Sequence, residues 1–249
     1  MSRAVLVTGG SRGIGAAIAD AFAQGGDRVA VHYGVSAQAA HAVVRGLPGA
    51  GHVAVQADLA DPEAVRAMVD QAADALGGLD VLVNNAGIYL DNPIDDDDYE
   101  RWQRTWRETL DVNLVGAANV TWCAVRHMRR RGGGRIVNVS SRGAFRGEPM
   151  HLAYGASKGA LNSFTQSLAR GLGKDGIVVT GIAPGFVATD MANEILDGPR
   201  HDEILAQSPF GRIATVAEVA RAVVFLADPA IEFTSGAILD INGASHLRI

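Results

Sequence analysis

The sequence predicts an α/β fold: a doubly wound, mostly parallel seven-stranded sheet with helices on both faces, in a single domain over residues 1–249. Short runs rich in β-branched residues alternate with long, Ala-rich stretches of helical period. The runs are mainly apolar on both faces, as strands buried on both faces are. Right-handed crossovers then place helices on both sides of the sheet. No linker or internal repeat divides the chain.

The expected elements follow one another along the chain. The strands are expected at Ala4–Thr8, Arg28–Tyr33, His52–Gln56, Leu79–Asn84, Arg135–Ser140, Gly176–Ala183 and Ala237–Ile241. The helices are expected at Gly13–Gln24, Ala37–Arg45, Pro62–Leu76, Tyr99–Arg131 in two segments, Leu152–Leu172 and Thr215–Leu226. Four consecutive acids, Asp95–Asp98, stand before a predicted helix, where negative charge stabilises the N-terminal dipole. The basic stretch Arg126–Arg131 before Gly132–Gly134 fits a helix C-terminus.

Composition excludes several functional classes. The net charge of −5 gives no electrostatic reason to expect nucleic-acid binding. Cys123 is the one cysteine, so an intrachain disulfide and a cysteine-built metal site are excluded, and we expect no metal. No apolar run reaches the roughly 18 residues that a membrane span needs. The segment MSRAVLVTGG lacks the apolar region of a signal peptide, so we expect a reducing, cytoplasmic location.

A glycine-rich turn joins the first predicted strand to the first predicted helix. It reads Thr8-Gly9-Gly10-Ser11-Arg12-Gly13-Ile14-Gly15. Glycines let the backbone turn tightly and approach a pyrophosphate, while the helix N-terminus supplies N–H groups and a positive dipole. Such a turn alone is weak evidence, but its place between a strand and a helix is the context that supports a dinucleotide site.

Tyr154 and Lys158 stand four residues apart in a predicted helix, so both side chains leave the same face. A tyrosine with a pKa of about 10 exchanges its proton poorly near neutral pH, and burial would raise that pKa further. A nearby ammonium opposes this by stabilising the phenolate, and the positive charge of an oxidised nicotinamide would add to the effect. For such a site to work, the effect of these charges on the tyrosine pKa must exceed that of burial. For an isolated pair, a half-buried tyrosine beside a solvated lysine is the favoured interpretation.

Other motifs in the chain favour a catalytic role for Tyr154 and Lys158 instead. Together with this pair, they make the chain similar to the short-chain dehydrogenase/reductase family over nearly its whole length. The shared motifs, in the family's order, are Gly9-x3-Gly13-x-Gly15, Asp58-Leu59, Asn84-Asn85-Ala86-Gly87, Asn113, Ser141, Tyr154-x3-Lys158, and Pro184-Gly185 with Thr189. The overall pattern resembles 3-oxoacyl-acyl-carrier-protein reductases and related bacterial dehydrogenases most. The resemblance implies a Rossmann fold and hydride transfer between a nicotinamide and a small-molecule carbonyl or secondary alcohol.

The resemblance also implies a role for each catalytic residue. Tyr154 is expected to be the general acid/base, and Ser141 to hydrogen-bond the substrate oxygen. Lys158 is expected to bond the nicotinamide ribose, and Asn113 to hold a water that links Lys158 to solvent. Strand alternation sends Ser140 and Ser141 to opposite sides, and the family's spacing to the tyrosine selects Ser141.

The cofactor contacts follow from the same resemblance. Asp58 is expected at the adenine amino group, Asn85–Gly87 along the adenosine, the backbone at Val187 at the nicotinamide carboxamide, and Thr189 at the carboxamide or diphosphate. The expected set is Gly9, Ser11, Arg12, Gly13, Ile14, Gly15, Asp58, Leu59, Asn85, Ala86, Gly87, Tyr154, Lys158, Pro184, Gly185, Val187 and Thr189. Simpler interpretations stay open: Asp58 as a strand-end cap, Asn84 as a sheet-end hydrogen-bonder, and Pro184-Gly185 as a plain turn.

The end of the second predicted strand favours NADP(H) over NAD(H). A 2′-hydroxyl is usually held there by an acid, whereas a 2′-phosphate needs cations and hydroxyls. The segment reads His32-Tyr33-Gly34-Val35-Ser36 and contains no acid. Arg12 and Ser36 can supply charge-assisted hydrogen bonds to a phosphate. The alternative is that Arg12 packs on the adenine and Ser36 merely starts the next helix.

Other segments give less specific predictions about function. Met191–Gly211 stands where the family has its substrate lid. Trp102 and Trp106 are expected in the core or in a subunit contact. Arg142, Arg146 and His151 follow the catalytic serine; an acidic substrate is compatible with them, but solvated loop arginines are the favoured interpretation.

Two further functional classes remain beside the reductase. A catalytically silent dinucleotide-binding regulator would keep the fold without turnover, although loss of Tyr154 or Lys158 would have been its signature. A lyase or epimerase is the other alternative, but the short C-terminal region leaves little room for a larger substrate domain. The family resemblance implies a homo-oligomer, with a tetramer favoured and with Tyr99–Arg131 and Leu152–Leu172 as contact surfaces.

Overall fold

Seven strands form one parallel sheet, and the computed structural model describes it through residues 2–189 and 201–248. The strands are β1 (Ala4–Val7), β2 (Arg28–Tyr33), β3 (Val53–Gln56), β4 (Val81–Asn84), β5 (Gly134–Val139), β6 (Ile177–Pro184) and β7 (Ile238–Ile241). Their order is β3-β2-β1-β4-β5-β6-β7, and every neighbouring pair is parallel. The doubly wound fold is confirmed. The sheet is wholly parallel, where the sequence predicted a mostly parallel one.

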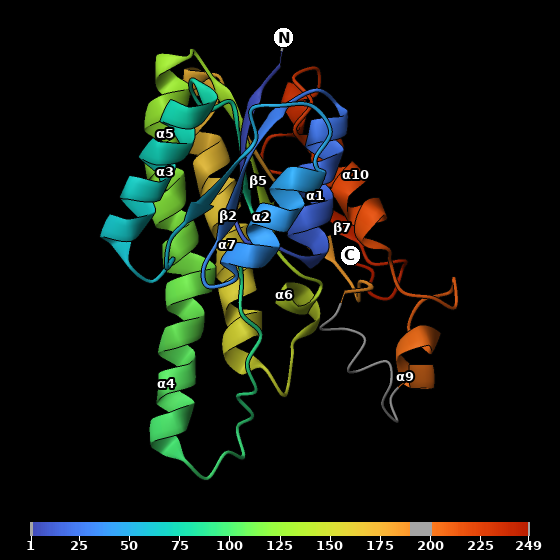
Figure 1. Cartoon of the computed structure of the whole chain (residues 1–249). Coiled ribbons are helices and arrows are strands. Elements are labelled where there is room, and N and C mark those ends of the chain that lie inside the picture. Colours follow the sequence, from blue (N-terminus) through green and yellow to red (C-terminus); the bar gives the residue numbers. More distant parts are fainter. Residues whose placement is uncertain (1, 190–200, 249) are drawn as a thin grey trace.

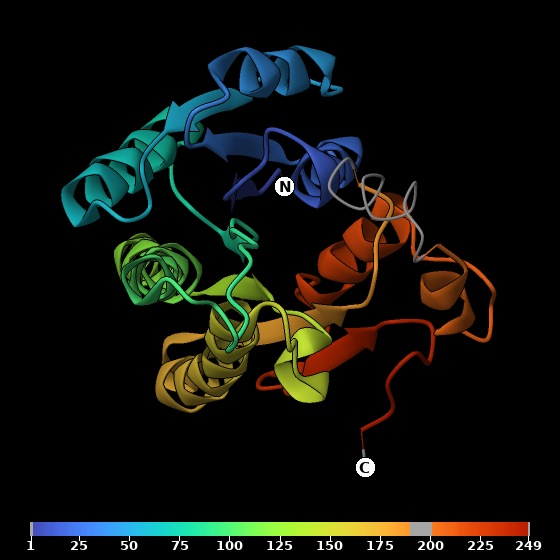
Figure 2. The same cartoon turned by 90° about the horizontal axis from the view of Figure 1, so that it is seen from below.

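Helices cover both faces of this sheet. They are α1 (Gly13–Gln24), α2 (Ala37–Gly46), α3 (Pro62–Leu76), α4 (Tyr99–Leu110), α5 (Ala117–Arg130), α6 (Gly143–Arg146), α7 (Leu152–Leu172), α9 (His201–Ala206) and α10 (Val216–Leu226). Shorter helical turns are η1 (Asp111–Gly116), η2 (Gly173–Asp175) and η3 (Glu232–Thr234). Figure 2 shows α1 and α10 on one side of the sheet and α5 and α7 on the other.

Alternate strand residues supply the two halves of the core. Ala4 and Leu6 of β1 pack with α3, α5 and α7, whereas Val5 and Val7 pack with α1, α2 and α10. All four side chains are fully buried. Because successive strand residues point to opposite faces, a strand with helices on both sides must be apolar at every position. This arrangement explains the continuous apolar runs of the sequence.

The expected division of Tyr99–Arg131 into two segments takes an unusual form. α4 and α5 are joined by the π-helical turn η1 rather than by a loop, and Figure 1 shows the long helical segment that results. Single π turns inside α-helices frequently occur at functional sites. Asn113 lies in this turn. Asp98 caps the N-terminus of α4 by accepting a hydrogen bond from the backbone N–H of Arg101, as the acidic run predicted.

The carboxyl ends of the strands lie at one end of the molecule, with α6, α9 and the start of α4 beyond them (Figure 1). The expected lid, Met191–Gly211, lies outside the described residues as far as position 200; its remainder contains α9. Within the described part of the chain, no helix is long and apolar enough to cross a membrane. The same residues contain no group of three His, Cys, Asp or Glu side chains arranged to hold a metal ion.

A buried polar network connects the sheet to the helices beneath the strand ends. Asn84 of β4 donates to Thr121 of α5 at 2.9 Å and to Asn138 of β5 at 2.8 Å. Asn138 in turn donates to Thr165 of α7 at 2.8 Å. Asn84 is therefore the structural hydrogen-bonder that one interpretation of the sequence proposed. Asn162, also on α7, is buried too, but neither polar atom of its side chain has a hydrogen-bond partner among the described residues.

This contrast gives a stability prediction. Asn138→Leu should lower the free energy of unfolding by about 1–3 kcal/mol, because it removes partners from two buried polar side chains. The same replacement at Asn162 should be neutral or stabilising, because it removes two unsatisfied buried atoms. Urea denaturation of both variants checks this, and equal destabilisation by the two changes would contradict it.

Candidate active site

The glycine-rich turn between β1 and α1 depends on three of its glycines. Gly9 and Gly13 adopt φ angles of +63° and +54°, which L side chains rarely adopt. A Cβ on Gly9 would lie 2.9 Å from Cα of Ala86, and one on Gly15 would overlap the carbonyl oxygen of Gly9. The turn therefore packs directly on the segment that follows β4.

Polar side chains from two neighbouring strands hold this turn in place. Nδ2 of Asn85 donates to the carbonyl oxygens of Thr8 and Gly9 at 2.9 and 3.1 Å. The backbone N–H of Gly9 donates to Nδ1 of His32 at 3.0 Å, and Nε2 of His32 lies 3.2 Å from the carbonyl oxygen of Ala57. Nδ1 must accept, so Nε2 carries the hydrogen and the ring is neutral. Burial lowers the pKa of His32, which favours the same neutral form.

The role of His32 was not predicted from the sequence, although a histidine inside a mainly apolar strand could have indicated a buried hydrogen-bonding group. Asp58 was expected at the adenine and also fitted a cap. It is exposed, and its Oδ1 accepts from the backbone N–H of Ala60 at 2.9 Å, so it does cap the turn after β3. This bond uses one carboxylate oxygen and is compatible with a ligand contact by the other.

The four expected catalytic residues lie together at the carboxyl edge of the sheet. Tyr154 and Lys158 share one face of α7, Ser141 follows β5, and Asn113 comes from η1. The Ser141 hydroxyl lies close enough to the Tyr154 hydroxyl to lower the Tyr154 pKa. Nζ of Lys158 lies 5.7 Å from the centre of the Tyr154 ring. The neighbouring Ser140 turns away, and its hydroxyl donates to the carbonyl oxygen of Lys158 at 3.2 Å.

Asn113 fixes the relation between β4 and α7. Its Oδ1 accepts from the backbone N–H of Ile88 at 2.8 Å, and its Nδ2 donates to Ile88 O and Ser157 Oγ at 3.0 and 3.2 Å. A Cβ on Gly87 would lie 3.2 Å from Oδ1 of Asn113 and 3.5 Å from Nζ of Lys158. Gly87 therefore leaves open the space beside the lysine.

Burial dominates the electrostatics of Tyr154 and Lys158. Desolvation raises the pKa of Tyr154, the Ser141 hydroxyl opposes that rise, and the charge of Glu148 adds to it. Desolvation lowers the pKa of Lys158 to about 8, so its ammonium is still charged at neutral pH. Among this chain's own residues, burial outweighs positive charge at Tyr154, so the lowering of its pKa that the site requires depends on further positive charge. Lys158 directs its Nζ to the carbonyl oxygen of Val139, 2.8 Å away, rather than to the phenol.

The expected cofactor contacts form a continuous line along the same edge. A Cβ on Gly13 would lie 3.3 Å from Cγ2 of Thr189, so the loop after β6 meets the glycine turn. Val187 forms an isolated parallel β-bridge with Ala214. Gly185 donates its backbone N–H to the carbonyl oxygen of Ile241 at 3.0 Å. The space left by Gly9, Gly13 and Gly87 at the N-terminus of α1 fits a dinucleotide, because the backbone N–H groups of a helix N-terminus suit a diphosphate.

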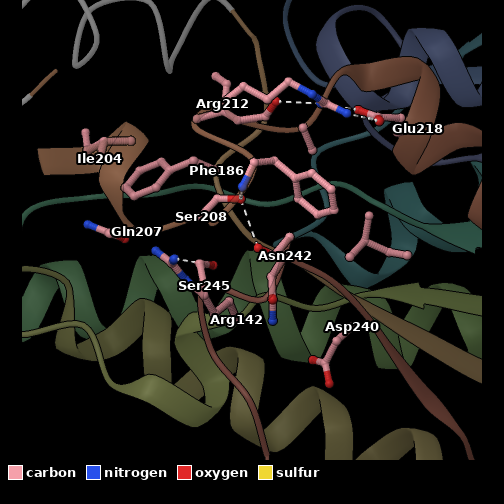
Figure 3. A pocket seen from close by; sticks show the side chains of 15 residues that line it. Arg142, Phe186, Ile204, Gln207, Ser208, Arg212, Glu218, Asp240, Asn242 and Ser245 are labelled. Carbon is pink, nitrogen blue, oxygen red and sulfur yellow. Dashed lines mark hydrogen bonds and ion pairs between the residues drawn. The ribbon is translucent and has the colours of Figure 1, made fainter. Parts of the chain in front are cut away.

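Arg142 is buried, so the prediction of a solvated loop arginine at this position was wrong. Its exposed fraction is 4%, its Nη1 donates to Oγ of Ser245 at 2.6 Å, and its guanidinium lies 5.1 Å from the centre of the Phe186 ring. Arg146 is exposed as expected and donates to Gln207 at 2.9 Å. Figure 3 shows Arg142 and Gln207 lining a pocket of about 220 Å³ that the sequence did not reveal.

The aromatic residues near the site have defined neighbours. The Tyr89 ring packs edge-on against Tyr154 at 4.7 Å and lies 3.7 Å from the ring of His151. Nδ1 of His151 lies 3.0 Å from the carbonyl oxygen of Leu90. His151 thus supports the ring that flanks Tyr154.

Comparisons with known proteins identify the family of this chain. Residues 3–200 match the family model described as short chain dehydrogenase. The 3-oxoacyl-acyl-carrier-protein reductase FabG of Staphylococcus aureus is 36% identical over 99% of each chain. Versicolorin reductase stcU of Emericella nidulans is 38% identical over 98% of this chain and 95% of its own. A short-chain dehydrogenase of Burkholderia cenocepacia, solved in complex with NADP, is 40% identical over 98% and 97% of the two chains, with a TM-score of 0.87. The chain therefore belongs to the short-chain dehydrogenase/reductase family and is an oxidoreductase that interconverts carbonyls and alcohols.

Proposed function

We propose that the protein is an NADP(H)-dependent oxidoreductase that interconverts a carbonyl and a secondary alcohol, with Tyr154 as the general acid/base. The observation that carries the proposal is the placement of the Tyr154 and Ser141 hydroxyls close together, with the buried ammonium of Lys158 5.7 Å from the centre of the Tyr154 ring. These two hydroxyls can both reach one substrate oxygen. The cofactor supplies or accepts the hydride.

Each residue of the chain has a distinct task in this proposal. Tyr154 donates its phenolic proton to the substrate oxygen during reduction and takes it back during oxidation. Ser141 donates a hydrogen bond to the same oxygen and stabilises its developing negative charge. Lys158 holds the nicotinamide ribose and keeps a positive charge near Tyr154. Asn113 positions α7 through Ser157 and is proposed to hold the water that replenishes the proton.

The glycine turn and the loop after β6 are proposed to hold the cofactor. The turn from Gly9 to Gly15 takes the diphosphate, Asp58 with Leu59 and Asn85–Gly87 take the adenosine, and Pro184 to Thr189 take the nicotinamide end. The relative solved with NADP supports this choice of ligand.

The surroundings of the adenosine ribose support a 2′-phosphate. Arg12 is exposed, and no side-chain hydrogen bond of Arg12 is found among the described residues. The Ser36 side chain makes no capping bond to α2. Both groups are therefore available for charge-assisted hydrogen bonds, and no acid at the end of β2 repels a phosphate.

A cytoplasmic location and a homotetramer remain predictions. Tyr99, Val115 and Trp122 along α4, η1 and α5 are exposed apolar side chains of the kind that subunit contacts cover. A measured solution mass tests the tetramer.

Replacing the general acid tests the mechanism. Tyr154→Phe should lower kcat at least about 10²-fold, because it removes the proton donor and keeps the ring. The substrate is the best one found in a panel of ketones, β-ketoacyl thioesters, sugars and polyols, and NADPH absorbance gives the rate. NADP⁺ affinity should change little. Tyr99→Phe, the same change at an exposed tyrosine, is the control. Near-normal turnover of Tyr154→Phe would refute the assignment.

The cofactor preference gives a second test. NADPH should bind more tightly than NADH, and Arg12→Ala should weaken NADPH binding about tenfold or more while changing NADH binding much less. Titration of cofactor fluorescence measures both affinities. Arg45→Ala removes an exposed arginine at the far end of α2 and should change neither. Tighter binding of NADH by the unmodified protein would contradict the proposal.

The neutral His32 predicts a loss of stability in acid. Its pKa is lower in the folded state than the unperturbed value of about 6.5, so the unfolded chain binds more protons as the pH falls. The contribution of His32 to the free energy of unfolding should be complete above pH ~6.5 and decline as the pH falls towards the folded-state pKa.

The control for this prediction keeps the acceptor and removes the titration. In His32→Asn, the side-chain oxygen can accept from Gly9 N–H at any pH. Urea denaturation and NADP⁺ titration at pH 7.5 and pH 5.5 should show a larger loss in the unmodified protein than in His32→Asn. Equal losses in both would contradict the role given to His32.

A further inference from the structure

Arg142 is a buried cation that has no carboxylate partner among the described residues. One of its five N–H donors is accounted for, in the bond from Nη1 to Ser245 Oγ. Glu148 is a carboxylate whose charge acts on Arg142, but it makes no ion pair with it. Burying a charge is costly unless it is paired, so a ligand anion would relieve an existing deficit.

Both carboxylates that line this pocket are ion-paired with other arginines. Glu218 makes a bidentate contact with Arg212 at 2.6 and 2.9 Å, and Oδ2 of Asp240 accepts from Arg248 at 2.8 Å. The buried Oδ1 of Asp240 has no hydrogen-bond partner among the described residues, and neither carboxylate is bonded to Arg142. In the pocket of Figure 3, Arg142 is therefore the cation without a carboxylate partner among the described residues.

The pocket walls suit a small polar anion. Gln207, Asn242 and Ser245 contribute polar side chains, and Phe186 lies against the guanidinium. The volume of about 220 Å³ holds a small group but not a folded partner. A guanidinium presents parallel donors that match the two oxygens of a carboxylate.

Arg142 is also adjacent to the reacting groups. It directly follows Ser141, and its backbone N–H donates to the carbonyl oxygen of Pro184 at 2.8 Å, in the segment that leads to Phe186. The Tyr89 ring packs edge-on against Tyr154, and Tyr89 is also within electrostatic range of Arg142. Arg142 is therefore a near neighbour of the catalytic hydroxyls.

We propose that Arg142 binds a carboxylate of the substrate, so that this enzyme acts on keto acids or the corresponding hydroxy acids. The carboxylate lies in the pocket of Arg142, Gln207 and Ser245, while the reacting carbonyl lies at Ser141 and Tyr154. This inference rests on the proposed function and specifies the class of substrate. It makes Arg142 a specificity-determining residue and leaves the proton and hydride steps unchanged.

The experiment compares keto acids with their primary amides, which have nearly the same shape and no charge. A series of 2-, 3-, 4- and 5-oxo acids is tested with NADPH. The unmodified protein should show at least tenfold higher kcat/KM for one of the acids than for its amide. Arg142→Met should lower kcat/KM for that acid roughly ten- to hundredfold and leave the amide nearly unaffected. Arg142→Lys keeps the charge without the paired donors, so its kcat/KM for the acid should lie between those of the unmodified protein and Arg142→Met.

A distant arginine provides the matched control. Arg170→Met removes an exposed cation in the last turn of α7 and should leave the preference for the acid unchanged. Equal kcat/KM for acid and amide in the unmodified protein would overturn the proposal. So would an equal loss on both substrates in Arg142→Met, which indicates a purely structural role, or an equal loss of preference in Arg170→Met.

Calorimetry separates this proposal from the proposed function. The same acids and amides are titrated into the protein with NADP⁺, which measures binding without turnover. Binding of an acid that is lost in Arg142→Met, in a protein that turns over none of the substrates, would support the carboxylate site and contradict the reductase. Turnover of neutral ketones with no measurable binding of any acid would support the reductase and contradict the carboxylate site.

Discussion

The carbonyl oxygen of Val139 accepts a hydrogen bond from Nζ of Lys158 at 2.8 Å, and this bond joins the end of β5 to the face of α7 that carries Tyr154. Both partners are buried, so the bond is not weakened by competition with water. It places the ammonium beside the phenol without pairing the two directly. Ser141, two residues after Val139, reaches the phenol from the same strand end.

The rest of the fold serves to keep these strand ends in register. The buried chain from Asn84 through Asn138 to Thr165 ties β4 and β5 to α7. The order of the sheet reverses its direction at β1, so crossovers leave towards opposite faces on its two sides. Ligands of open α/β sheets bind in the crevice at such a point. The glycine turn stands there, held by His32 from β2 and by Asn85 after β4.

Local patterns predicted much of this architecture. The bounds of α1, α3 and α7 coincide with those expected, and for α3 the cap Asp61 with Pro62 and the C-terminal Gly77 mark the helix ends in the sequence itself. The spacing of Tyr154 and Lys158 was sufficient to place both on one helix face. The order of the motifs along the chain brought Ser141 and Asn113 to them.

Features that depend on distant packing were not predictable. The burial of Arg142 requires Ser245 and Phe186, which are far away in sequence. The π turn at Asn113 has no breaker residue to announce it. The net direction of the Tyr154 pKa shift was also not predictable, because it depends on where the Lys158 ammonium points within the folded site.

The account therefore depends on a contest at Tyr154 between desolvation, which raises its pKa, and positive charge, which lowers it. The most direct measurement is the titration of Tyr154 by NMR of protein labelled with ¹³C at the tyrosine ring carbon that bears the hydroxyl, assigned with Tyr154→Phe. Without cofactor, the Tyr154 signal should titrate above the ordinary value of about 10, and bound NADP⁺ should lower its pKa. A Tyr154 pKa that is below the ordinary value without cofactor, or that NADP⁺ leaves unchanged, would contradict the account.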